Sequence, residues 1–219
     1  MFFQKVVKGI ANISSYEAQA IVEANGIVCN WWRNAVTITK EEIKSNLVDS
    51  NIFHHLNHYN HKLPSGHSLA HLGTSYGDVS PFISTTAGAI QRDAFHRRNI
   101  LFDPFITALC FATNNFTASG FVFYAYLITL GKAAVALEQF AEEVRELHIY
   151  QYYLPYHHEG EIMAKVVIPS AQIEKAEEYD GPAVLRELKN RRKPVPISAV
   201  ITNPAYSHPD DFINIRELL

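Results

Sequence analysis

The spacing of apolar residues along the chain predicts helices mainly in its first half. In SSYEAQAIVEANG, residues 14–26, apolar side chains recur with helical spacing, Ser15 is the expected cap and Gly26 the expected stop. A second helix is expected over DPFITALCFATNN, residues 103–115, because Asp103 and the proline after it suit a cap and a first helical position. Further helical segments are expected within 40–63, at 142–147 and at 182–193.

Strands are expected where β-branched and aromatic residues form short apolar runs, and these runs are more frequent in the second half. Residues 64–81 carry Pro, Gly and Ser and predict an exposed loop, and residues 87–99 predict a turn or short helix. Because no repeat, low-complexity tract or linker interrupts the chain, we expect one α+β domain over residues 1–219. The expected strands are 26–38, 82–86, 120–130, 132–140, 161–168 and 195–206.

Composition and charge narrow the class of protein. The chain has 219 residues, is 47% hydrophobic and carries a formal net charge of −3, a globular composition without an overall basic field for nucleic acid or anionic membrane. The apolar span 120–137 is about as long as a membrane-spanning helix, but Gly131 and Lys132 interrupt it, so it is interpreted as two buried strands. We expect no membrane association.

The N-terminus and the cysteines bear on the compartment. Residues 1–18 lack the charged leader, apolar core and cleavage site of a signal peptide and are interpreted as mature protein. Cys29 and Cys110 are too few for a disulfide framework or a thiolate metal site, which suits a reducing compartment. A cytoplasmic location is therefore expected.

Two carboxylates stand at the mouth of an apolar strand in YHHEGEIMAKVVIP, residues 156–169. If the strand begins at Glu159, then Glu159 and Glu161 point to the same face, because side chains alternate along a strand. Two like charges at such a short distance repel each other. An ordinary strand avoids such a pair, so the pair suggests a site that needs two acids.

Three short motifs in order resemble the Arg–Ser–Glu branch of the ADP-ribosyltransferase superfamily, which includes the cholera- and pertussis-toxin-like enzymes. That family has an aromatic residue and arginine on its first core strand, a Ser-Thr-Ser or Ser-Thr-Thr motif after an apolar strand, and Glu-x-Glu at a later strand. This sequence has W-W-R at 31–33, F-I-S-T-T at 82–86 and E-G-E at 159–161. The resemblance implies two packed, mainly antiparallel sheets that form an NAD cleft, with flanking helices.

The resemblance also implies roles for single residues. Glu161 would bind the ribose and face the positive charge that develops when the nicotinamide–ribose bond of NAD breaks. Glu159 would position or deprotonate the attacking group, and Ser84 would hold Glu161 in its rotamer. Arg33, on a strand, would grip the pyrophosphate with paired hydrogen bonds. NAD binding would involve Arg33, Asn34, Ser84 and Thr85.

The sequence departs from the family pattern at two positions. Asn34 follows the arginine where the family often has a small residue or aspartate, and Thr86 ends the second motif where the family often has serine. Each motif also has an ordinary interpretation when it is taken alone. Arg33 would stack on a neighbouring tryptophan, Ser-Thr-Thr would begin a turn, and Glu-Gly-Glu would be a solvated strand entry.

Histidines in the segment 54–71 offer a second kind of site. His54, His58 and His61 share one face of a helix if the segment is helical, and His67 and His71 repeat the four-residue spacing. Such a set could bind zinc, but no carboxylate or cysteine lies in a zinc-motif frame with it. We expect no metal and interpret the segment as a solvated flap near the NAD cleft.

The acceptor of the ADP-ribose is left open between two classes. The Glu-x-Glu motif in this family usually accompanies protein arginine as the acceptor. However, Tyr150, Tyr152, Tyr153 and Tyr156 precede it and could stack unpaired bases, with the basic segment 186–193 to hold phosphate. Modification of a nucleic-acid base is therefore an alternative, and an inactive binding protein is another. The biology we expect is an intracellular toxin or defence effector, restrained by an antitoxin protein.

Overall fold

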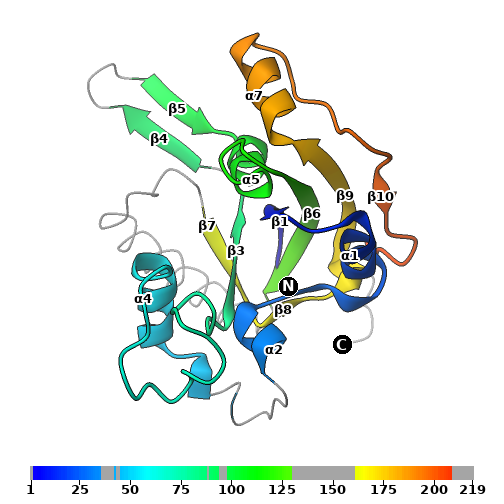
Figure 1. Cartoon of the computed structure of the whole chain (residues 1–219). Coiled ribbons are helices and arrows are strands. Elements are labelled where there is room, and N and C mark those ends of the chain that lie inside the picture. The colour runs from blue at the N-terminus through cyan, green and yellow to red at the C-terminus, as the bar shows by residue number, and fades with distance from the viewer. Residues whose placement is uncertain are drawn as a thin grey trace.

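A six-stranded antiparallel sheet forms the centre of the computed structural model, which describes residues 2–35, 42, 45–87, 89–93, 98–129 and 161–208. The strand order is β10-β9-β6-β1-β3-β7, so strands far apart in the sequence become neighbours (Figure 1). This mixture of helices with an antiparallel sheet confirms the α+β class. The strands are β1 (Phe2–Ala11), β3 (Phe82–Thr86), β6 (Ser119–Thr129), β7 (Glu161–Lys165), β9 (Ile173–Asp180) and β10 (Ile201–Thr202).

Two pairs of short strands accompany the main sheet. β2 (Ile27–Val28) pairs with β8 (Val167–Ile168), and β4 (Ala89–Asp93) pairs with β5 (Arg98–Phe102). The turn or short helix expected at 87–99 is therefore wrong. Each strand of the β4–β5 pair is stabilised by its partner, and a local pattern does not reveal such pairing.

Helices cover both faces of the main sheet. On one face, Ala18 of α1 (Ser15–Ala20), Val22 of η1 (Ile21–Asn25) and Trp31 of α2 (Asn30–Asn34) join the core cluster that includes Phe121 and Phe123 of β6. On the other face, α5 (Pro104–Ala112) and α7 (Gly181–Lys189) pack against Val122 and its neighbours. The alternation of Phe121, Val122 and Phe123 between the two clusters follows from the two-residue period of a strand.

The helices predicted over residues 14–26 and 103–115 are confirmed, with a change at one cap. Asp103 caps α5, and Gly26, at φ 68°, ends the helical segment that begins with α1. The cap of α1 is Ser14 and not Ser15. Ser14 Oγ accepts a hydrogen bond from Glu17 N, and Glu17 Oε2 accepts one from Ser14 N. α4 (Asp49–Asn57) lies within the segment expected to be helix and loop, and η2 (Ser170–Gln172) is a short 3₁₀ turn.

The N-terminal segment forms the central strand β1, which the sequence analysis did not identify. β1 pairs with β6 from Phe2 to Ala11, and with β3 on its other side. Its apolar residues are interrupted by Lys5 and Lys8, so the segment lacks the unbroken pattern of a buried strand. Only the partners on either side define it as one.

The strand expected over residues 26–38 ends after Val28, and Trp31, Trp32 and Arg33 lie on a helix. The placement of Arg33 on a strand is therefore wrong. Cys29 caps this helix, since its Sγ accepts from Trp32 N at 3.4 Å, and burial of Trp31 holds the helix against the core. Residues 36–38 lie outside the described part of the chain.

The strand expected over residues 161–168 is also divided. Val166, at φ 63°, separates β7 from β8, and its N–H and carbonyl bond to Pro81 O and Cys29 N. The chain thereby passes from the main sheet to the β2–β8 pair. The final strand expected at 195–206 is reduced to β10, and the helix expected to reach residue 193 ends at Lys189. The segments expected at 132–140 and 142–147 lie outside the described residues.

Two further expectations concern the whole chain. Within the described ranges, no helix has both the length and the apolar character needed to cross a membrane. Cys29 and Cys110 are not joined by a disulfide. The expectation of a single domain over residues 1–219 stays a prediction.

We predict that Gly9→Ala destabilises the fold strongly. A Cβ at Gly9 would lie 2.0 Å from Ala108 O and 2.5 Å from Ala112 N, so α5 would have to move away from β1. The expected loss is about 3 kcal/mol of unfolding free energy, the upper range for overpacking. The control is Gly66→Ala, which meets no atom within 4 Å and carries only the strain of φ +80°, about 1 kcal/mol. Chemical denaturation measures both; equal losses would contradict this packing.

Candidate active site

A cleft opens where β1 and β3 separate. The two strands are neighbours in the sheet, yet they pair at one position, Val7 with Thr86, whereas β1 pairs with β6 along its whole length. Beyond Val7, residues 8–11 of β1 and 82–84 of β3 form opposite walls of a cleft of about 230 Å³. The side chains that bring chemistry to this cleft are Lys8, Arg33, His55, Tyr59, Ser84 and Phe111.

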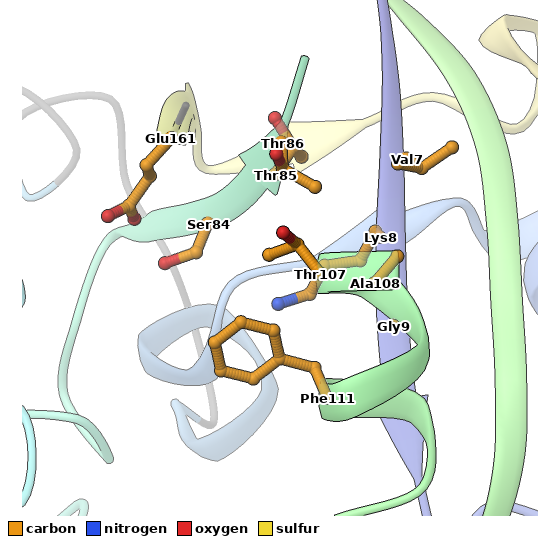
Figure 2. Close-up of a pocket in the computed structure, with 10 residues that line it drawn as sticks. All are labelled: Val7, Lys8, Gly9, Ser84, Thr85, Thr86, Thr107, Ala108, Phe111 and Glu161. Carbon is orange, nitrogen blue, oxygen red and sulfur yellow. The ribbon is translucent and has the colours of Figure 1, made fainter. Parts of the chain in front are cut away.

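Ser84 and Glu161 lie on the same face of the sheet. Glu161 is directly opposite Thr86 in the β3–β7 register, and Ser84 is two residues before Thr86. Because side chains alternate along a strand, Ser84 and Glu161 are diagonal neighbours whose side chains can meet. They line a hollow of about 30 Å³ that shares Lys8, Ser84 and Phe111 with the cleft, and Figure 2 shows both side chains pointing the same way.

His55, on α4, contacts both of these side chains. The side chain is 3% exposed, and its Nε2 lies 2.8 Å from Ser84 Oγ and 3.7 Å from Glu161 Oε1. Its Nδ1 lies 2.6 Å from Ser80 Oγ. Figure 1 shows α4 beside the part of the sheet formed by β3 and β7. A helix outside the sheet therefore completes the site.

The environment keeps Glu161 ionised. Burial raises its pKa, but the polar interactions with His55 and Ser84 and the charge of Lys8 outweigh burial and hold the pKa below the usual value. Glu161 is thus a carboxylate at neutral pH, with about a fifth of its side chain exposed (21%). A negative charge of this kind can stabilise a positive charge that forms in the cleft.

Lys8 is a half-buried basic residue of the site. Burial lowers its pKa most, Glu161 opposes this effect, and the charge of Arg33 lowers the pKa further. None of the ion pairs between described residues includes Lys8. Figure 2 shows its side chain extending from β1 toward the strand that carries Ser84. An ammonium group in this position can attract an anionic group of a ligand.

Arg33 and Asn34 are placed differently from each other. Arg33 lines the cleft from α2 and is exposed, with Nη2 donating to Val28 O at 3.4 Å. It therefore reaches the cleft, although from a helix. Asn34 donates from Nδ2 to Asp78 O at 3.0 Å and so holds the loop 64–81 against α2. Its predicted contact with NAD stays a prediction.

Thr85 and Glu159 complete the set of predicted residues. Thr85 is buried and borders the hollow that Ser84 and Glu161 share. Glu159 lies outside the described residues, so the structure places one member of the predicted pair of carboxylates, Glu161. The structure thus brings Arg33, Ser84, Thr85 and Glu161 to one region.

The predicted histidine face forms a stacked aromatic group. His54 Nδ1 lies 3.1 Å from His58 Nδ1, His54 stacks on Tyr76 at 4.0 Å, and His58 stacks on His61 at 4.8 Å. Among the residues that the structure describes, no group of three or more His, Cys, Asp or Glu side chains is arranged to hold a metal ion. These rings pack on one another, while His55 from the same helix enters the site.

Sequence reasoning missed Lys8 and His55. Lys8 had a signal, because a charged residue within the apolar run VVKGI is either exposed or functional. His55 had no comparable signal in the sequence. It is one of several histidines in FHHLNHYNH, and the helical spacing singles out His54 instead. Only the packing of α4 on β3 distinguishes His55 from His54.

Comparison with known proteins adds no assignment. No protein-family model matches the chain, and no curated protein matches it significantly. What the site can do is therefore argued from its own geometry.

We predict that the stability contributed by Glu161 depends on pH. Its folded-state pKa is below the ordinary value of 4.5, so the ionised form contributes stability that is present above that value and is lost as the pH falls through the folded-state pKa. Relative to Glu161→Gln, the wild type should lose unfolding free energy on acidification. Urea unfolding of both proteins from neutral pH down to about pH 3 measures the difference. A constant difference would contradict the depressed pKa.

Proposed function

We propose that this protein is a mono-ADP-ribosyltransferase of the Arg–Ser–Glu type, which cleaves NAD and transfers ADP-ribose to a macromolecular acceptor. The observation that carries the proposal is the contact of Ser84 with an ionised Glu161, its diagonal neighbour, beside a cleft that two basic residues, Lys8 and Arg33, also line. The second and third sequence motifs supply the first two of these residues. The fold that the family resemblance implies is part of the same proposal.

The chemistry of bond cleavage suits Glu161. Breaking the nicotinamide–ribose bond generates an oxocarbenium-like state, and a fixed carboxylate stabilises that state electrostatically. The polar interaction with Ser84 would hold the carboxylate in place before the charge forms. The aromatic rings of Tyr59 and Phe111, both partly exposed and both lining the cleft, offer faces for a planar ring.

The two cations suit the diphosphate of NAD. In the family pattern, an arginine belongs to the first core strand; we take β1 as that strand on this chain, where Lys8 and not an arginine stands at the cleft. Arg33 approaches the same cleft from α2. We therefore assign the attraction of the diphosphate to both residues, with Arg33 at the exposed side and Lys8 at the buried side.

The acceptor remains a choice between protein arginine and a nucleic-acid base, with protein as our proposal. Glu159, Tyr153 and Tyr156, on which the choice depends, lie outside the described residues. The proposal includes the action of the protein within the cell as a toxin or defence effector, with an antitoxin as partner. The test is incubation with NAD labelled in its adenylate and with total cell lysate. Label removed by protease and resistant to nuclease supports protein; the reverse supports a base.

We predict that Glu161→Gln reduces NAD hydrolysis and transfer by at least ~100-fold, because the variant keeps size but loses the charge that faces the oxocarbenium. NAD binding, measured by calorimetry, should change little. Glu23→Gln, an exposed carboxylate on η1, is the matched control and should hydrolyse NAD like the wild type. Near-normal turnover in Glu161→Gln would reject the proposed function.

We predict that Lys8→Met and Arg33→Met both weaken NAD binding by about tenfold or more, the scale of one charge-assisted hydrogen bond. Their effects on stability should differ. Lys8 is a cation whose pKa burial lowers, so its removal should maintain or raise the free energy of unfolding at neutral pH, while removal of exposed Arg33 should leave it unchanged. Calorimetry and urea unfolding provide the two readouts. Unchanged affinity in both variants would reject the diphosphate assignment.

A further inference from the structure

His55 connects three elements through its two ring nitrogens. Nε2 contacts Ser84 Oγ on β3 and approaches Glu161 on β7, while Nδ1 contacts Ser80 Oγ in the loop before β3. The ring is fixed further by edge contacts with Tyr59 at 5.3 Å and Phe82 at 5.8 Å between centroids. A buried imidazole with both nitrogens engaged and both sides packed has one orientation.

Both ring nitrogens of His55 are bonded to serine hydroxyls. Phe82 N–H donates to Ser80 Oγ at 3.2 Å, which leaves this oxygen one lone pair and its own proton for His55. Nδ1 of His55 lies 2.6 Å from Ser80 Oγ, and Nε2 lies 2.8 Å from Ser84 Oγ. The imidazole therefore links the loop before β3 to the serine at the cleft.

The contacts of His55 extend to the carboxylate. The hydrogen bond and the charge of His55, followed by the hydroxyl of Ser84, hold the pKa of Glu161 below its usual value against the effect of burial. His55 thus reaches Glu161 directly, at 3.7 Å, and also through Ser84. Polar side chains connected in this way strengthen each other's hydrogen bonds.

This arrangement differs from that of a catalytic serine with a histidine base. In such a triad, a carboxylate accepts from the nitrogen of histidine that faces away from the serine and stabilises the imidazolium. Here that nitrogen meets the neutral hydroxyl of Ser80, and Glu161 is on the same side of the ring as Ser84. The ring of His55 is therefore placed to orient Ser84 and Glu161 together.

We infer that His55 is a positioning residue, which holds the Glu161 carboxylate at the cleft through its contacts with Ser84 and with the carboxylate itself, and thereby makes α4 part of the active site. The catalytic consequence rests on the proposed function. The positioning itself is a property of the folded protein and can be measured without substrate.

Two substitutions at His55 separate its contacts. Asparagine places a polar atom where Nδ1 lies, so His55→Asn keeps the reach to Ser80 and loses Ser84. Glutamine places a polar atom where Nε2 lies, so His55→Gln keeps the contact with Ser84 and loses the contact with Ser80. His54→Asn is the matched control, because His54 precedes His55 on α4 but bonds to His58 and stacks on Tyr76.

The experiment measures kcat and KM for NAD hydrolysis and, separately, the titration of the Glu161 carboxyl by NMR in substrate-free protein. We expect His55→Asn to lower kcat by about ten- to a hundredfold with KM unchanged, as for loss of a hydrogen bond to a charged site. The Glu161 pKa should rise in the same variant. His55→Gln should retain kcat within a few-fold of the wild type, and His54→Asn should match the wild type in both readouts.

The outcomes distinguish positioning from plain structural support and from failure of the proposed function. Equal losses of kcat in both His55 variants, with an unchanged Glu161 pKa, would overturn the inference. If His55→Asn does not fold, His55→Leu, which removes both ring nitrogens, takes its place with the same two readouts. A Glu161 pKa and a kcat that remain near wild type in that variant would overturn the inference, and shifts in both that His55→Gln does not show would support it. If the wild type does not cleave NAD, the proposed function fails, and a Glu161 pKa that still rises in His55→Asn supports the positioning alone.

Discussion

β1 is bound to β6 along its whole length and to β3 at one pair of residues, and this asymmetry creates the site. β1 is held in place by its pairing with β6 and by α5, which lies so close to Gly9 that a single methyl group there would collide with its backbone. Beyond Val7, the space between β1 and β3 is a cleft instead of a strand pair. Its walls carry Lys8 on one side and Ser84 on the other.

Opposite charges share this confined space at some cost to stability. Burial disfavours the charged forms of both Lys8 and Glu161, and the polar interactions with His55 and Ser84 restore the charge on Glu161. The charge of Glu161 raises the pKa of Lys8, but burial has the larger effect, so this pKa remains below its ordinary value. Ionisable groups with pKa values shifted in this way are typical of sites that bind or transform a charged ligand.

Contrast with another buried carboxylate in the same sheet supports this view. Glu177 accepts hydrogen bonds from Tyr124, Tyr179 and Lys175 at 2.7 to 2.8 Å, so its bonding capacity is largely used within the fold. Glu161, by comparison, borders a hollow and faces a cleft with two cations. The same residue type thus has a structural role on β9, while on β7 it is free to act on a ligand.

The sequence by itself determined the elements whose signals are local. Proline and aspartate at the start of α5, the glycine after η1 and the apolar runs of β3 and β6 predict these elements because caps and side-chain alternation act over a few residues. The meeting of Ser84 with Glu161 was expected from motif order alone. Tertiary structure decided the rest: β1 became the central strand, Arg33 moved onto a helix, and His55 entered the site in place of its neighbours. These outcomes depend on partners distant in sequence, since strand pairing, the capping of α2 by a buried cysteine and the packing of α4 are contacts that no local pattern encodes.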